Sequence, residues 1–186
     1  MYDYKNNEAI EKVLIDSETI ENRVKEIARD IDRDFADKRL VMVGILKGSF
    51  IFFGDLVRNL TIPAEIEFMK VSSYGSGTVS FGEIKVSLDI GREDLSECDL
   101  LVVEDIIDSG KTLSKLVPHL AKRARSVKTC TLLDKPERRE VDFSTDYCGF
   151  TIPDEFVVGY GLDYDEKYRN LPDIGVLAPR IYTNED

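Results

Sequence analysis

The stretch LLVVEDIIDSGKTL, residues 100–113, decides the fold that the sequence predicts. It opens with the apolar run 100–103, continues with Glu104 and Asp105, and ends in a small polar loop that contains Gly110. A short β-branched run without alternating polar residues is typical of a strand buried on both faces of a parallel sheet. Ligands bind at the carboxyl ends of such strands, so we expect the two carboxylates and the loop to form a binding site.

The loop at residues 108–112 predicts a phosphate site. Its backbone N–H groups open the next helix, and such turns bind anions with help from the helix dipole. Ser109 and Thr112 add hydroxyl donors. We therefore expect a phosphate to lie among Asp108, Ser109, Gly110, Lys111 and Thr112.

The adjacent acids point to a sugar phosphate and argue against a nucleoside triphosphatase. The P-loop pattern G-x-x-x-x-G-K-[ST] needs glycine at position 105, where the chain has Asp105, and G-x-G-x-x-G is absent. Carboxylates accept hydrogen bonds from a vicinal diol or bind Mg²⁺ through oxygen. A ribose 5-phosphate would place its phosphate in the loop and its hydroxyls, or a metal, at Glu104 and Asp105.

The flanking sequence alternates between strand and helix patterns. Helical spacing predicts helices at 17–36, 49–60 and about 113–124, the first with Ser17 as its N-cap. Apolar or alternating runs predict strands at 40–46, 64–71, 84–88, 100–104, 127–133 and 155–162, and one more in the tail. This order predicts an α/β fold with a doubly wound, mostly parallel sheet. We expect a single domain, 1–186, in which segments 1–16 and 150–186 form a small hood lobe.

Charge and composition exclude several classes of protein. The chain has 25 basic and 36 acidic residues, so its net charge is −11, which argues against general nucleic-acid binding. Three widely spaced cysteines without a C-x-x-C pair predict reduced thiols and a cytoplasmic location. No stretch approaches about 18 uninterrupted apolar residues, so we expect no membrane span. His119, the one histidine, is expected to be structural, which argues against a Ser-His-Asp hydrolase.

The segment VVEDIIDSGKTL, 102–113, resembles the phosphoribosyl-diphosphate (PRPP) signature of the type I phosphoribosyltransferases, in its hypoxanthine-guanine variant. Four other landmarks of that branch match in order: LKGSF at 46–50, SSYG at 72–75, LLDKPERR at 132–139 and FVVGYGLDYDEKYRNLP at 156–172. The resemblance implies transfer of the 5-phosphoribosyl group from PRPP to hypoxanthine and guanine, with IMP or GMP and pyrophosphate as products. It also implies the fold of that family.

The resemblance also implies roles for the residues around PRPP. Asp108 is the expected base that takes the proton from the purine. Lys47 and Gly48 are expected to bind pyrophosphate together with Arg169, in a segment that carries a non-proline cis peptide in the family. Mg²⁺ is the implied cofactor, with Glu104, Asp105 and Asp163 as its ligands.

The purine side and the flap follow from the same resemblance. Lys135 matches the lysine that contacts the 6-oxo group, and its neighbours Arg138 and Arg139 are expected to be solvated charges. Phe156 should stack on the base, with Val157 reading its edge and Asp163 close by. The flap residues Ser72, Ser73, Tyr74 and Gly75 should close over the substrates and exclude water.

Some alternatives stay open from the sequence. A xanthine- or guanine-preferring enzyme would use the same residues, and an RNA-binding regulator could share the fold, although the acidic charge argues against it. The family forms dimers and tetramers, so a homodimer or homotetramer is expected, with PRPP and a 6-oxopurine as the small-molecule partners. No membrane and no nucleic-acid partner is expected.

Overall fold

The computed structural model describes residues 8–72, 79–81 and 84–183. Its α-helices are α1 (Ser17–Asp34), α2 (Phe50–Asn59) and α3 (Lys111–Ala121). A central sheet contains β2 (Leu40–Leu46), β3 (Ala64–Ser72), β4 (Val79–Phe81), β5 (Ile84–Leu88), β6 (Asp99–Ile107), β7 (Ser126–Asp134) and β8 (Tyr147–Thr151). A smaller sheet contains β1 (Ile10–Ile15), β9 (Val157–Val158) and β10 (Ile174–Leu177).

The central strands are buried on both faces, as their wholly apolar sequences require. In β2, Leu40 and Met42 join the cluster that contains the apolar faces of α1 and α2. Val41 and Val43 point to the opposite face, where they join the cluster that contains α3. Successive side chains of a strand alternate between faces, so a run without polar residues fits only a sheet that is covered on both sides.

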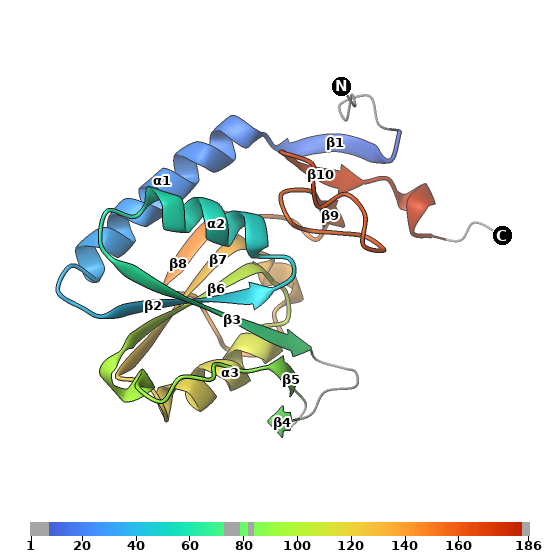
Figure 1. The fold of residues 1–186 in the computed structure, drawn as a ribbon. Coiled ribbons are helices and arrows are strands. Elements are labelled where there is room, and N and C mark those ends of the chain that lie inside the picture. The colour runs from blue at the N-terminus through green and yellow to red at the C-terminus, as the bar shows by residue number, and fades with distance from the viewer. Residues whose placement is uncertain (1–7, 73–78, 82–83, 184–186) are drawn as a thin grey trace.

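The sheet is doubly wound around the boundary between β2 and β6. The strand order is β4-β5-β3-β2-β6-β7-β8, and β3, β2, β6, β7 and β8 run parallel. From β2 the chain passes through α2 to β3 on one side, whereas from β6 it passes through α3 to β7 on the other. Helices α1 and α2 cover one face and α3 covers the opposite face (Figure 1). The predicted fold class is confirmed, and β4 with β5 adds an antiparallel edge.

Helix α1 begins at Ser17, as predicted, but its N-cap lies one residue earlier than predicted. Asp16, not Ser17, is the N-cap, and its side chain accepts a 2.7 Å hydrogen bond from the backbone N–H of Thr19. Such a cap satisfies one of the open N–H groups of the first turn. The apolar stripe that faces the sheet consists of Ile20, Val24, Ile27, Ala28 and Ile31, which recur at helical spacing.

Strand β6 is longer than predicted. It continues to Ile107 because its pairing with β7 continues through Ile106–Leu133 and Ile107–Asp134. Glu104 and Asp105 therefore lie inside the strand rather than at its end. Adjacent strand residues point to opposite faces, so these two carboxylates are directed apart.

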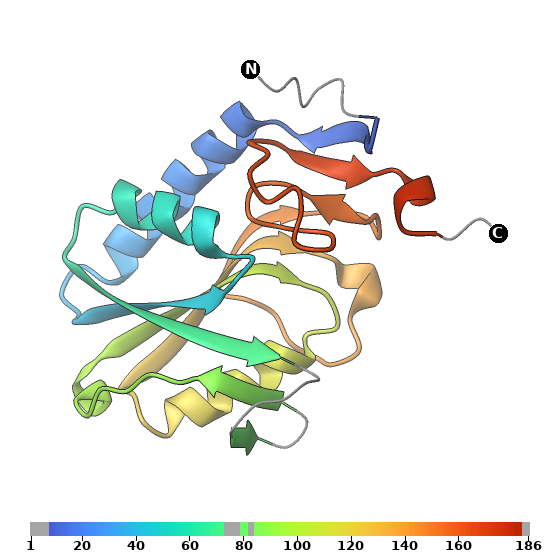
Figure 2. The same ribbon diagram turned by 45° about the vertical axis from the view of Figure 1, so that its right-hand side comes forward.

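The smaller sheet takes its strands from both ends of the described chain. β1 and β9 each pair antiparallel with β10, and Figure 2 shows this sheet beside the carboxyl ends of the parallel strands. The strand predicted at 155–162 is only the two residues of β9, because positive φ angles at residues 159–161 turn the chain. Strands β1 and β8 were not predicted. The hood-lobe boundary at 150 stays a prediction, since Thr151 still belongs to β8.

Within the described residues, no helix combines the length and the hydropathy that crossing a membrane requires.

Candidate functional site

The site lies at the carboxyl ends of β2, β6 and β7, near the boundary between β2 and β6 where the winding of the chain reverses. The turn with Lys47 and Gly48 follows β2, the loop 108–110 follows β6, and Lys135 follows β7. A Cβ at position 48 would overlap Asp105 Oδ2, so the turn after β2 packs directly on the Asp105 carboxylate. Two predicted segments that are far apart in the sequence therefore meet here, and only glycine allows the contact. The Leu46–Lys47 peptide is cis, as the resemblance implied.

The carboxylate of Glu104 is partly buried and lacks a partner. Its Oε2 atom is inaccessible to solvent and has no hydrogen bond from any described residue. Burial, and to a smaller extent the nearby charge of Asp105, raises the pKa of Glu104 well above its usual value. A buried acceptor without a donor is uncommon in proteins and suits a ligand hydroxyl or a cation.

Asp105 is in a related but distinct setting. Its Oδ1 accepts a 2.9 Å hydrogen bond from the backbone N–H of Ile106, while Oδ2 faces Gly48. Burial raises the pKa of Asp105 to about 6, although hydrogen bonds from the backbone oppose this shift. The environment thus disfavours the charged form of both carboxylates, and a bound cation or hydrogen-bond donors would stabilise it.

The loop after β6 forms a small pocket with the start of α3. Gly110 has a φ of 78°, and a Cβ there would lie 3.1 Å from Arg139 Cδ. The first N–H groups of α3 lack helical partners and face an anion-binding position. The pocket has a volume of about 190 Å³ and is lined by Glu104, Ile106, Ile107, Asp108, Ser109, Gly110, Thr112 and Leu113.

This pocket brings together most of the predicted ribose and phosphate residues, with two exceptions. Asp105 does not line it, because its side chain points toward Gly48. The ammonium group of Lys111 forms an ion pair with Glu140, and its backbone N–H donates a 3.3 Å hydrogen bond to Ser109 Oγ. Lys111 therefore supports the loop, and its side chain does not line the pocket.

Arg139 is part of the site, contrary to the expectation of a solvated charge. Its Nη1 donates a 2.6 Å hydrogen bond to the backbone carbonyl of Asp108, and its Nη2 pairs with Asp134. Its side chain is only 17% exposed, whereas that of Arg138 is 53% exposed. The sequence offered no signal to separate the two arginines, because both follow the same turn after β7.

Asp108 and Lys135 face each other at this edge. Asp108 Oδ1 is inaccessible to solvent and has no hydrogen bond from a described residue, while Lys135 Nζ lies 3.9 Å from it. Lys135 is buried, and the same ammonium lies 3.9 Å from Asp154 Oδ1. Both distances exceed hydrogen-bond length, so these groups attract one another by charge without a direct hydrogen bond.

A network of charged side chains joins the turn after β2 to the loop after β9. Lys47 Nζ donates to Glu166 Oε1 at 2.7 Å, and Arg169 Nη2 lies 3.1 Å from Glu166 Oε2. Arg169 Nη2 also lies 2.8 Å from Asp163 Oδ1. The two predicted pyrophosphate ligands, Lys47 and Arg169, are thereby brought to one carboxylate.

Glu166 is a site residue that sequence reasoning missed. Hydrogen bonds from Lys47 and then Arg169 lower its pKa, so it stays charged at neutral pH. It lies in a turn where Asp165, Glu166 and Tyr168 all have positive φ, a conformation that side chains rarely adopt. The acidic residues between Asp163 and Arg169, two positions that match the family motif, were the sequence signal that could have indicated this role.

The predicted base-stacking residue is supported by aromatic neighbours. Phe156 is 38% exposed, and its ring stacks on that of Tyr182 with centroids 5.0 Å apart. Tyr164 contacts Phe156 edge-on at 5.6 Å. Val157 is buried and pairs with Val176 of β10. One face of Phe156 is thus covered, which holds its ring in a defined orientation.

The residues fit a divalent cation in part. Among the described residues, no three His, Cys, Asp or Glu side chains are grouped to hold a metal ion. Mg²⁺ often needs only one or two carboxylates when phosphate oxygens complete its shell, and the unpartnered Glu104 Oε2 suits that role. Asp163 already accepts from the Glu166 N–H at 2.9 Å and pairs with Arg169, so it would have to give up a partner.

The predicted flap falls mostly outside the described residues. Ser73, Tyr74 and Gly75 are not described, and Ser72 is the last residue of β3. The flap stays a prediction.

A family model described as a phosphoribosyl transferase domain matches residues 13–165. The hypoxanthine-guanine phosphoribosyltransferase of Bacillus subtilis is 49% identical over 174 residues, which cover 93% of this chain and 96% of that protein. The bifunctional protein TilS/HprT of Listeria monocytogenes is 49% identical over 175 residues, which cover 94% of this chain. The chain spans 27% of the length of that bifunctional relative.

Solved structures show the same similarity. A hypoxanthine phosphoribosyltransferase from Staphylococcus aureus superimposes with a TM-score of 0.91 at 44% identity, and the match covers 99% of this chain and 100% of that one. A hypoxanthine phosphoribosyltransferase of Trypanosoma cruzi gives a TM-score of 0.87 at 43% identity, with 95% and 96% covered. The family model, the relatives and the structures agree along nearly the whole chain. The chain therefore belongs to the phosphoribosyl transferase family.

Proposed function

We propose that the chain transfers the 5-phosphoribosyl group of PRPP to hypoxanthine and guanine, releasing pyrophosphate and forming IMP or GMP. The observation that carries this proposal is the pocket at the start of α3, where the Gly110 loop meets the unpartnered carboxylate of Glu104. An anion site and a hydroxyl or metal site lie side by side there, as a ribose 5-phosphate requires. The names of the relatives from B. subtilis and S. aureus support the choice of substrate.

The ribose phosphate is held at two ends in this proposal. The N–H groups around Gly110 and the hydroxyls of Ser109 and Thr112 bind the 5-phosphate, and the dipole of α3 favours its charge. Glu104 accepts a hydrogen bond from a ribose hydroxyl. The carboxylate of Asp105 lies against Gly48. Its negative charge would stabilise the positive charge that develops on the sugar carbon in the transition state.

The purine and the leaving group lie on opposite sides of that sugar. A purine ring nitrogen forms the new bond to the anomeric carbon as the bond from that carbon to the pyrophosphate oxygen breaks. Asp108 takes the proton from the purine, and its Oδ1 accepts no hydrogen bond from a described residue. Lys135 donates to the 6-oxo group, Phe156 stacks on the base and Val157 reads its edge. Lys47, Gly48 and Arg169 hold the departing pyrophosphate.

We also propose Mg²⁺ as the cofactor, with Glu104, Asp105 and Asp163 as its ligands. Because the carboxylates of Glu104 and Asp105 point apart, they would serve different positions rather than one ion. Bound there, the metal would neutralise the negative charge of PRPP and of the leaving pyrophosphate. Residues 72–75 act as a flap that covers the substrates. We place the protein in the cytoplasm.

A homodimer or homotetramer is proposed as well. Phe50 on α2 and Ile66 on β3 are 46% and 47% exposed, and Phe68 on the same strand is 38% exposed. Ile66 and Phe68 alternate onto the same face of β3, and large apolar side chains that stay exposed there favour a covered interface.

A product assay tests the proposed function. The protein is incubated with PRPP and Mg²⁺ and with hypoxanthine, guanine, xanthine, adenine or uracil in turn. We expect IMP and GMP to form with equal amounts of pyrophosphate, and adenine to react very slowly because Lys135 offers a donor to an amino group. Preference for xanthine would change the substrate within the same reaction. No product from any 6-oxopurine would contradict the proposal.

A further inference from the structure

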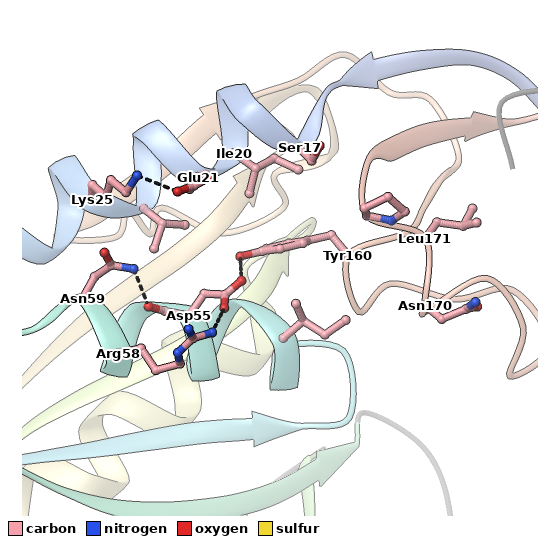
Figure 3. A pocket seen from close by; sticks show the side chains of 13 residues that line it. Ser17, Ile20, Glu21, Lys25, Asp55, Arg58, Asn59, Tyr160, Asn170 and Leu171 are labelled. Carbon is pink, nitrogen blue, oxygen red and sulfur yellow. Dashed lines mark hydrogen bonds and ion pairs between the residues drawn. The ribbon is translucent and has the colours of Figure 1, made fainter. Parts of the chain in front are cut away.

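One hydrogen bond connects the loop that carries Arg169 to helix α2. The O–H of Tyr160 donates to Asp55 Oδ2 at 2.8 Å, and the ring of Tyr160 is buried. Figure 3 shows Tyr160 reaching from the loop after β9 to Asp55 on α2. Asp55 is itself held in place, because Arg58 Nη1 lies 3.5 Å from its Oδ1 and Asn59 Nδ2 donates to its carbonyl at 2.8 Å.

This hydrogen bond lies at the wall of a cavity, and the ring of Tyr160 packs in the same core cluster as residues of α1 and α2. A cavity of about 520 Å³ separates α1 and α2 from residues 170–172. Its charged walls pair with each other, as in the 2.6 Å contact of Lys25 Nζ with Glu21 and the contact of Arg58 with Asp55. These four charged groups on its walls are therefore paired with one another.

Tyr160 is coupled to the pyrophosphate side of the site through its neighbour Gly161. A Cβ on Gly161 would overlap the carbonyl oxygen of Gly48, so this part of the loop lies directly on the turn after β2. The carbonyl of Gly161 accepts a 2.8 Å hydrogen bond from Arg169 Nη1, and its N–H donates to the Arg169 carbonyl at 2.9 Å. A shift of Tyr160 would therefore move Gly161 relative to both Gly48 and Arg169.

The purine side of the site is held separately. Val157 and Val158 pair with β10 through Val176 and Gly175, and Phe156 packs on Tyr182. Those contacts belong to the smaller sheet and its aromatic neighbours, and none of them is made by the side chain of Tyr160. Loss of the Tyr160 hydroxyl should therefore leave the purine contacts in place.

The hydroxyl of Tyr160 is a donor at every physiological pH. Burial, and then the hydrogen bond to Asp55, raises the pKa of Tyr160 far above that of an ordinary tyrosine. The contact to Asp55 thus persists throughout the working range of the protein.

We propose that Tyr160 is a positioning residue. Through its hydrogen bond to Asp55, it holds the pyrophosphate half of the site, which is Lys47 with residues 159–169, against α2. The inference rests on the proposed function. According to this inference, Tyr160 and Asp55 do not contact the substrates, but they strengthen the binding of PRPP and pyrophosphate. They have no comparable effect on the binding of the purine.

The test compares Tyr160→Phe with a matched variant, Tyr147→Phe. Tyr147 also donates to a carboxylate on a helix, Asp34 Oδ2 at 2.7 Å, but it lies on β8 away from the site. For Tyr160→Phe we expect the KM for PRPP and the Kd for inorganic pyrophosphate, measured by calorimetry with Mg²⁺, to rise about tenfold, the loss of one hydrogen bond to a charged group. The KM for hypoxanthine should stay within about twofold in both variants, with unchanged PRPP values in Tyr147→Phe.

Changes at Asp55 complete the test and guard against a variant that fails to fold. Asp55→Ala should reproduce the effect of Tyr160→Phe. Asp55→Asn should keep most of the affinity for PRPP and pyrophosphate that Asp55→Ala loses, because its amide oxygen still accepts a hydrogen bond. The double change of Tyr160→Phe with Asp55→Ala should be no worse than either change alone. Equal loss of purine and PRPP affinity, additive effects, or no change would overturn the inference while wild-type turnover leaves the proposed function intact. A wild-type protein that neither turns over PRPP nor binds pyrophosphate would overturn both.

Discussion

The two halves of the proposed site are built in different ways. The ribose-phosphate half, around residues 104–112, consists of a strand in the middle of the sheet, a glycine turn and a helix start, and its ligand-facing groups are mainly backbone N–H groups and short side chains. The pyrophosphate half, Lys47 with residues 159–169, consists of long charged side chains that bind one another across a turn of positive φ. The geometry of the first half is fixed by the backbone fold. The geometry of the second half depends on ion pairs between side chains, which an anionic ligand can replace.

This difference explains why Glu166 lies between Lys47 and Arg169. Two cations brought close together for an anionic ligand repel each other, and a carboxylate between them stabilises the arrangement when the ligand is absent. In the ribose-phosphate half no such substitute is needed, because the helix N-terminus carries only partial charge. We expect substitutions in the two halves to differ in size and even in sign.

Gly48→Ala should have one of the two largest effects, since Gly48 is where the two halves touch. The added Cβ would overlap Asp105 Oδ2, so the turn after β2 or the carboxylate has to move. A displacement of about 1 Å at a reacting site can cost roughly 100-fold, so we expect kcat/KM for PRPP to fall by about that much. Gly54→Ala, on α2 where a Cβ meets nothing, is the control. Near-normal kinetics in Gly48→Ala would separate the two halves.

Asp108→Ala tests the chemistry of the ribose-phosphate half. A positioned base typically contributes about 100-fold or more, so kcat should fall by at least that factor while the melting temperature stays close to that of the wild type. Binding of IMP should persist, because the backbone N–H groups of the loop are untouched. Unchanged turnover would exclude Asp108 as the base.

Arg139→Gln should weaken the support of the same loop. The change removes charged hydrogen bonds to the Asp108 carbonyl and to Asp134, which should lower the free energy of unfolding by about 1.5–3 kcal/mol, and turnover should decrease with it. Arg138→Gln is the matched control, because its 3.3 Å contact with Asp154 is exposed and should contribute about 0–1 kcal/mol. Denaturant unfolding of both variants gives the comparison, and equal losses would show that Arg139 has no special role.

Glu166→Gln should have the smallest effect, and of opposite sign. It removes the carboxylate that competes for Lys47 and Arg169, so we expect pyrophosphate to bind about threefold more tightly at low salt, a change typical of exposed ion pairs. Asp165→Asn makes the same change of charge in the same turn, but its carboxylate pairs with Lys167. Weaker binding in Glu166→Gln alone would mean that Glu166 orders the cations rather than competing with the ligand.

The sequence predicted the ribose-phosphate half better than the pyrophosphate half, for a physical reason. In β6, the loop and α3, local pattern decides the structure, so the strand, the glycine turn and the helix were all found from residues 100–124. The end of β6 was misplaced because its last residues are fixed by pairing with β7. Strand β1 was missed because its pairing partner, β10, lies far along the chain, and β8 was missed because it is a short edge strand of five residues.

Side-chain contacts between distant segments escaped prediction in the same way. Glu166 reaches Lys47 and Tyr160 reaches Asp55 across more than 100 residues of sequence. Arg139 and Arg138 are neighbours in sequence and differ only in what the fold places beside them. Such roles depend on the folded arrangement and leave no local pattern.

A crystal structure of the protein with IMP and Mg²⁺ tests the central claim most directly, because it locates the two ends of the sugar phosphate. We predict the 5-phosphate within hydrogen-bond distance of the N–H groups that follow Ser109, and a ribose hydroxyl on the carboxylate of Glu104. A nucleotide whose phosphate lies on Lys47 and Arg169, with Glu104 still unpartnered, would contradict the account.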